Sequence, residues 1–140
     1  MKLSDAATRV SDLGSKIYDY YTSELPKYYR NYPLVSPGEE GAPPPPEENE
    51  LRQFLETLPA DMVYRLALIM YLGREDFRTD DLADKYENAE STFGDSEYLR
   101  SVMVAHSPLV SYLSDGLEEL HKHGIDVDAL PLNGVVVQKR

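Results

Sequence analysis

Three consecutive charged residues, Arg74, Glu75 and Asp76, are compact enough to form an acid–base cluster. An enzyme built on Arg74 and Asp76 would need both to line a concave pocket in which the carboxylate has a perturbed pKa. Charged triplets between helices more often form caps and salt bridges. We therefore assign no catalytic residue and treat the three as a candidate binding site.

The three histidines offer little metal chemistry. Glu118 and His121 have the Glu-x-x-His spacing of di-metal sites in helical bundles, but such sites need a second copy of the motif and two further carboxylates. The sequence has no second copy, no Gly-x-Ser-x-Gly, no phosphate-binding glycine loop and no Rossmann fingerprint. Cysteine is absent, which excludes disulfides and cysteine-based sites. We expect no metal and no cofactor.

Asp80, Asp84 and Glu87 form an acidic series about one helical turn apart, close to the phosphate spacing along a nucleic acid strand. An acidic inhibitor that mimics nucleic acid could use such a series through charge complementarity. The alternative is an ordinary solvated helix face. Direct binding to nucleic acid or to an anionic membrane is not expected, because the net charge is −11.

A tyrosine-rich segment between residues 18 and 32 is a second candidate binding surface. Tyrosine is frequent at interfaces because it combines a large apolar ring with a polar tip. The alternative is that the rings only cover a helix end and the loop after it. The tyrosines are Tyr18, Tyr20, Tyr21, Tyr28, Tyr29 and Tyr32, of which the last three are the binding candidates.

The element that must position these groups is the apolar run from Met62 to Leu72. Leu, Met and Ala favour a helix, and Pro59 suits its first turn. Gly73 stands where a left-handed C-terminal cap is expected. We predict a central helix over about residues 60–73 that is covered on several sides, because it is apolar nearly all round. It is too short to span a membrane.

Further helices are predicted around the central one, giving an all-α bundle of about five helices. The first begins at Ser4 as N-cap, and its apolar seam either packs on the core or forms a dimer. A helix at 48–58 and one from Thr79 to about Phe93 follow. The last helix ends at a Gly124 cap, and Gly116 marks a close helix approach.

Four segments are expected in the 140 residues. Residues 1–32 hold the first helix and the tyrosines, and residues 33–50 form a flexible Pro- and Glu-rich linker with four consecutive prolines. Residues 51–124 form the helical core, and residues 125–140 form a mostly extended tail. The absence of cysteine and of an apolar leader predicts a soluble cytoplasmic protein.

The run from Leu72 through Gly73, Arg74, Glu75 and Asp76 to Phe77, with the helices that follow it, resembles a bacterial family of small helical proteins. This is the family numbered 3775 in the series of domains of unknown function. Its usual loop reads Leu-Gly-Arg-Gly-Asp-Phe, so Glu75 departs from it. The resemblance covers about residues 50–120. It implies an all-α fold and no particular activity, cofactor or substrate.

These observations favour a small acidic protein that acts as a non-enzymatic protein–protein interaction or regulatory module, through a protein partner or self-association. One alternative is the acidic inhibitor that mimics nucleic acid. The second alternative is an enzyme with a site around Arg74 and Asp76.

Overall fold

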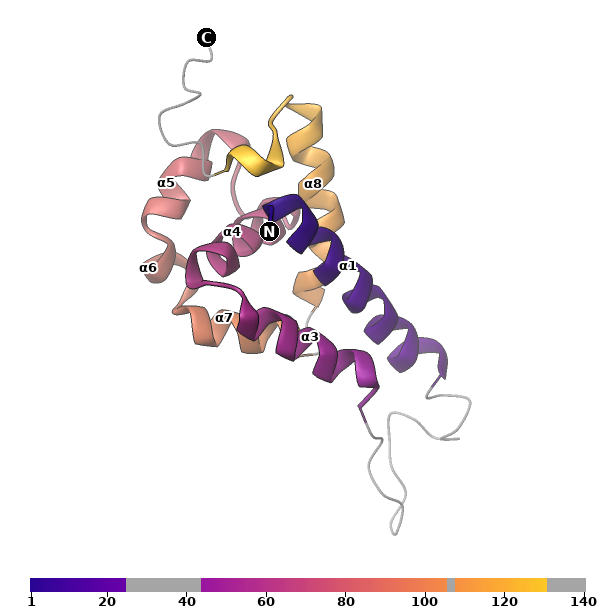
Figure 1. The fold of residues 1–140 in the computed structure, drawn as a ribbon. Helices are drawn as coiled ribbons and strands as arrows, with labels where there is room; N and C mark the ends of the chain where they lie inside the picture. Colours follow the sequence, from indigo (N-terminus) through magenta and orange to yellow (C-terminus); the bar gives the residue numbers. More distant parts are fainter. Residues whose placement is uncertain (25–43, 106–107, 131–140) are drawn as a thin grey trace.

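The computed structural model describes residues 1–24, 44–105 and 108–130 (Figure 1). These residues contain helices and no strand, so the predicted all-α class is confirmed. The α-helices are α1 (Leu3–Asp19), α3 (Pro46–Thr57), α4 (Ala60–Gly73), α5 (Leu82–Glu87), α6 (Ala89–Phe93), α7 (Ser96–Val104) and α8 (Tyr112–Lys122). A π-helical turn η1 (Tyr20–Glu24) and three 3₁₀ turns, η2 (Thr79–Asp81), η3 (Pro108–Ser111) and η4 (Val127–Ala129), complete the list.

Helix α4 is the central helix, as predicted. Every residue from Leu66 to Met70 is fully buried. The helix contacts α1, α5, α7, α8 and η3, which together cover its apolar surface (Figure 1). In the described ranges no helix has both the length and the apolar character needed to cross a membrane.

Helices α4 and α8 cross closely, because two glycines meet the backbone of the opposite helix. A Cβ on Gly116 would overlap the carbonyl oxygen of Ile69, and a Cβ on Gly73 would overlap that of Tyr112. The close approach predicted for Gly116 is therefore confirmed. The prediction that Gly73 is a left-handed cap is wrong, because Gly73 lies inside α4 and Glu75 has the positive φ of 68°.

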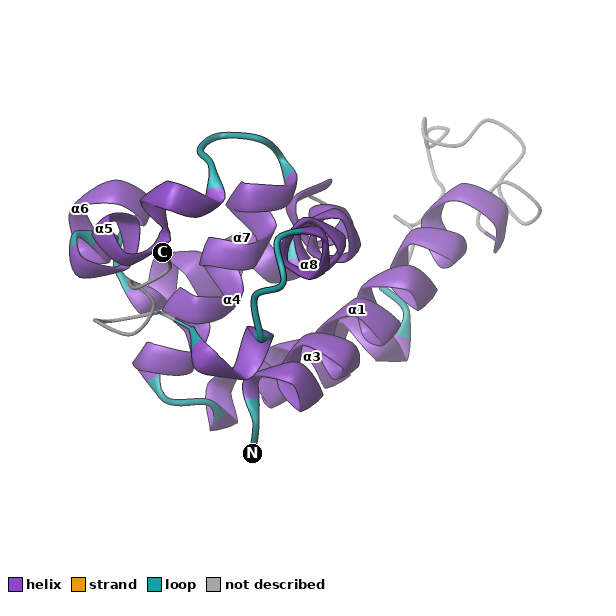
Figure 2. Ribbon diagram, turned by 90° about the horizontal axis from the view of Figure 1, so that it is seen from above, coloured by secondary structure: helices purple, strands orange, loops and turns teal. Residues whose placement is uncertain are grey.

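Helix α1 packs along α3 at one edge of the molecule (Figure 2). The apolar seam that the sequence indicated is buried within the single chain, and only its last member, Tyr20, is half-exposed. The buried residues of this face are Leu3, Ala6, Ala7, Val10, Leu13 and Ile17.

The N-terminus of α1 is capped from the other end of the chain. The helix begins at Leu3, so the prediction of Ser4 as N-cap is wrong. Instead the Ser4 backbone N–H donates to Asp128 Oδ1 at 2.8 Å, and the Ser4 hydroxyl donates to Oδ2 at 2.9 Å. A carboxylate at this position satisfies a free N–H group and interacts favourably with the helix dipole.

Asp128 is held in place by the segment that follows α8. Ile125 and Val127 are half-buried against the core, and Leu130 is 3% exposed. Residues 125–130, which the sequence assigned to an extended tail, thus contribute to the core and contact α1 through η4. The remainder of the predicted tail, residues 131–140, lies outside the described residues.

The Asp128 cap gives a testable dependence of stability on pH. Hydrogen bonds from Ser4 lower the pKa of Asp128 below its ordinary value of 3.8. A carboxylate with a lowered pKa stabilises the fold fully above its unfolded pKa, and this contribution is lost as the pH falls through the folded value. Asp128→Asn is therefore expected to lower the thermal unfolding temperature at pH 7. The difference from the wild type should shrink below a pH of about 3.8.

The predicted helix from Thr79 to Phe93 is divided into η2, α5 and α6. The division between α5 and α6 falls at Asn88, whose φ of −107° and ψ of 30° are not helical. The Asn88 side chain donates to the Asp84 carbonyl at 3.0 Å. Such local side-chain bonds compete with helix propagation, and asparagine makes them readily.

Candidate functional site

The loop after α4 carries the first candidate residues and is built on a Schellman motif. The Asp76 N–H donates to the Tyr71 carbonyl at 3.1 Å, and the Glu75 N–H donates to the Leu72 carbonyl at 2.9 Å. This motif needs a left-handed residue at the position of Glu75, where glycine has no steric penalty. The loop of the resembling family has glycine there, so this chain places a charged side chain at a strained and exposed point.

Glu75→Gly is expected to raise the free energy of unfolding by about 0.5–1 kcal/mol. The relief of left-handed strain outweighs the entropy lost by glycine on folding. Chemical denaturation monitored by circular dichroism measures the change. Glu75→Ala is the matched control, because it removes the carboxylate and keeps the Cβ. An equal gain in both variants would attribute the effect to charge and contradict the strain argument.

Arg74 and Asp76 bind each other rather than facing a cavity. Arg74 Nε donates to Asp76 Oδ1 at 3.1 Å and Nη2 donates to Oδ2 at 2.7 Å. The guanidinium also lies 4.7 Å from the centre of the Tyr71 ring, and that ring stacks on Phe93 at 4.8 Å. Hydrogen bonding to Asp76 raises the pKa of Arg74. The ion pair therefore holds the loop against the stacked rings of Tyr71 and Phe93.

A groove lies on the other side of the same loop, between residues 72–80 and α8. We call it the loop–α8 groove, and its volume is about 700 Å³. It is lined by Glu75 and Asp80 but by neither Arg74 nor Asp76. Of the predicted site residues, Glu75 and Asp80 therefore share this groove, whereas Arg74 and Asp76 do not line it. Phe77, which is half-buried, supplies an aromatic surface within the groove.

Carboxylates dominate the loop–α8 groove. Its two walls carry Glu75, Asp80, Asp115, Glu118 and Glu119, against the cationic or titratable side chains Arg78, Lys122 and His123. The charge of Glu119 is paired locally at the end of α8, with Lys122 at 3.4 Å and with His123 at 3.0 Å. The hydrogen bond from His123 is the main cause of the lowered pKa of Glu119. The other carboxylates give the groove an acidic character.

The acidic series is exposed, as a mimic would require, although the helix is not continuous. Asp80 lies on η2, while Asp84 and Glu87 lie on α5, and all three side chains are exposed. Only Asp80 also lines the loop–α8 groove. Across residues 1–24, 44–105 and 108–130, no group of three or more His, Asp or Glu side chains is arranged to hold a metal ion.

The candidate tyrosines Tyr28, Tyr29 and Tyr32 lie outside the described residues. Of the neighbouring tyrosines, Tyr18 is 66% exposed on α1. Tyr21 instead donates to Glu48 of α3 at 2.9 Å, so it joins the end of the first helical segment to the core.

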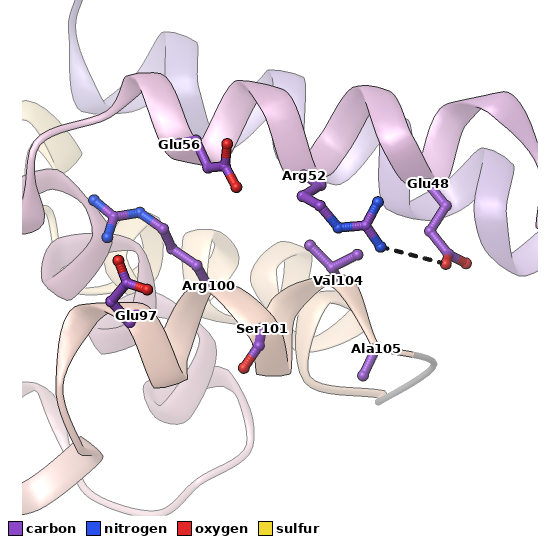
Figure 3. A pocket seen from close by; sticks show the side chains of 8 residues that line it. All are labelled: Glu48, Arg52, Glu56, Glu97, Arg100, Ser101, Val104 and Ala105. Atoms are coloured by element: carbon purple, nitrogen blue, oxygen red, sulfur yellow. Dashed lines mark ion pairs between the residues drawn. The ribbon is translucent and has the colours of Figure 1, made fainter.

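A second groove, which the sequence reasoning missed, lies between α3 and α7 (Figure 3). Its volume is about 660 Å³. Arg100 extends between Glu56 of α3 and Glu97 of α7, and Arg52 pairs with Glu48 at 3.8 Å. Alternating charges on two short helices gave no spacing signal, because the residues meet only when α3 and α7 pack. Arg100 also has a structural task in this α3–α7 groove, since its guanidinium donates to the carbonyls of Leu55 and Leu58.

The fold is a small all-α domain that carries the loop–α8 groove, lined mainly by carboxylates, and the α3–α7 groove, lined by side chains of both charges. The family model described as "Protein of unknown function (DUF3775)" matches residues 48–121, and the chain belongs to this family. Comparisons with curated proteins and with solved structures found no match. The matched residues begin in α3 and end in α8, so they contain the α3–α7 groove and most of the loop–α8 groove.

Proposed function

We propose that this protein is a non-enzymatic interaction module that binds a basic segment of a protein partner in the loop–α8 groove. The observation that carries the proposal is the lining of this groove, which combines five carboxylates with Phe77. Lysine and arginine side chains complement the carboxylates, and an apolar side chain of the partner can pack on the ring. The absence of cysteine is consistent with the reducing cytoplasm, which we propose as the compartment.

The geometry of the loop supports binding rather than catalysis. Arg74 and Asp76, the pair on which an enzyme would depend, already form two mutual hydrogen bonds and line neither groove. Glu75 and Asp80 are exposed within the loop–α8 groove, so a partner can reach them without displacing a buried group.

Affinity capture with a charge-reversed groove tests the proposal. The Asp80→Lys and Glu118→Lys double variant should retain the fold, because both side chains are exposed, and should lose captured partners by at least about tenfold. The matched control reverses Asp5 and Asp12, two exposed carboxylates of α1 outside the groove. Partners recovered equally with both double variants would reject the groove as the binding site.

The acidic inhibitor remains the alternative, and the exposure of Asp80, Asp84 and Glu87 favours it. In that case the partner is a nucleic-acid-binding protein, and added nucleic acid competes for it. Asp84→Asn with Glu87→Gln should then weaken binding, whereas a partner of the loop–α8 groove should tolerate this change. A mimic also requires affinity that falls steeply between low and high salt, so a salt-insensitive complex would exclude it.

A further inference from the structure

The loop after α4 holds one arginine by a ring and a carboxylate together. Arg74 forms two hydrogen bonds with Asp76, and its guanidinium lies 4.7 Å from the centre of the Tyr71 ring. A guanidinium suits both contacts at once, because its flat face stacks on a ring while its edge donates to two carboxylate oxygens. The ammonium group of lysine has no such plane. A ring combined with a carboxylate therefore favours arginine over lysine.

The loop–α8 groove contains the same two components. Phe77 supplies the ring, and Glu75 and Asp80 come two residues before it and three residues after it. Most carboxylates of the groove have no cation beside them. Those that form no ion pair within the described residues are Glu75, Asp80, Asp115 and Glu118. The groove therefore provides a ring and unpaired carboxylates to a cation from outside the described chain.

The Phe77 ring is half-buried and already has a cation in its neighbourhood. It packs on Phe93 with the ring centres 6.4 Å apart, which fixes its position. Lys85 of α5, which does not line the groove, places its Nζ 5.9 Å from the centre of the Phe77 ring. That distance is at the outer limit of about 6 Å for attraction of a cation by a ring. Because Phe77 lines the groove, a guanidinium that enters it can reach the same ring.

We propose that the loop–α8 groove recognises an arginine of the basic partner segment, with the guanidinium stacked on Phe77 and donating to the groove carboxylates. This inference rests on the proposed function and names the side chain by which the partner is selected. The guanidinium takes the ring face that an apolar side chain would otherwise cover. The carboxylates attract any cation, whereas the ring favours a flat one. Phe77 is therefore the residue that determines specificity.

Titration calorimetry of the full chain with hexa-arginine and hexa-lysine peptides tests the inference. The wild type is expected to bind hexa-arginine about fivefold more tightly than hexa-lysine. Phe77→Leu keeps an apolar side chain against Phe93 and should reduce this preference to about twofold or less. Phe77→Trp should preserve or increase it, because tryptophan is the strongest ring for cation–π contacts. Tyr18→Leu is the matched control, since it removes an exposed ring of α1 outside the groove and should leave the preference unchanged.

The two proposals fail in different ways. An arginine preference that is the same in Phe77→Leu and the wild type would overturn the role of Phe77. If the Asp80→Lys and Glu118→Lys double variant still weakened both peptides, the groove itself would stand as the binding site. Peptides that bind neither protein, or that bind the double variant as well as the wild type, would overturn the groove and the arginine inference together. Circular dichroism checks that Phe77→Leu is folded, and a lower preference in Phe77→Trp than in the wild type would by itself contradict the inference.

Discussion

Gly116→Ala is expected to lower the free energy of unfolding by about 3 kcal/mol or more, or to prevent folding altogether. The added Cβ would overlap the carbonyl oxygen of Ile69 and lie 2.7 Å from Ile69 Cγ2. A flexible side chain could move away from such a contact, but the backbone of a buried helix cannot. Because α4 and α8 pack closely at this point, the whole crossing would have to separate. Urea denaturation followed by circular dichroism measures the loss.

Ser114→Ala is the matched control for this prediction. It lies on the exposed face of α8, two residues from Gly116, and introduces the same methyl side chain. Alanine has the higher helix propensity, so this variant should be unchanged or slightly more stable. A Gly116→Ala protein with wild-type stability would mean that α4 and α8 do not approach closely at this point.

Arg100→Met is expected to destabilise the protein by about 2–3 kcal/mol. Arg100 Nε donates to the Leu55 carbonyl at 3.0 Å, and Nη2 donates to the Leu58 carbonyl at 2.8 Å. Leu55 lies in the last turn of α3 and its carbonyl also accepts the Leu58 N–H at 3.2 Å, whereas Leu58 is the C-cap residue, beyond the last helical residue. Methionine preserves the apolar stem of the side chain and removes only the guanidinium. The Leu58 carbonyl then loses the guanidinium, the Leu55 carbonyl keeps only the Leu58 N–H, and thermal unfolding should show the loss.

Arg52→Met is the control from the facing wall of the same α3–α7 groove. Arg52 is exposed and pairs with Glu48 at 3.8 Å, a contact of the kind that contributes little. Its replacement should change stability by no more than about 0.5 kcal/mol. Equal losses in the two variants would attribute the effect to groove charge rather than to the cap on α3.

The elements with a strong local signal were predictable. The Leu-, Met- and Ala-rich run of α4 fixes its own helical state, and burial follows from its apolar surface. Gly124 has a φ of 67°, and the bond from Ile125 N–H to the Leu120 carbonyl completes the predicted cap. Both features depend on residues that are close together in the sequence.

The features that failed depend on partners distant in the sequence. The residues around Gly73 indicate a helix cap. Its missing side chain instead allows α8 to approach closely, and Glu75 adopts the left-handed conformation. The sequence indicates Ser4 as an N-cap. In the structure its backbone N–H instead donates to the Asp128 carboxylate. In each case the residue type indicated a particular structural role, but that role depends on a distant segment of the chain rather than on neighbouring residues.

The same division holds for the candidate site. Composition established the acidic character of the chain, and the loop motif identified its family. Which carboxylates share a surface depended on packing, because α8 approaches the loop only through the glycine crossing. That approach makes Glu118 and Asp80 line the same groove, while Arg74 pairs with Asp76 outside it. A linear sequence records neither the distance between two helices nor the direction in which a loop turns.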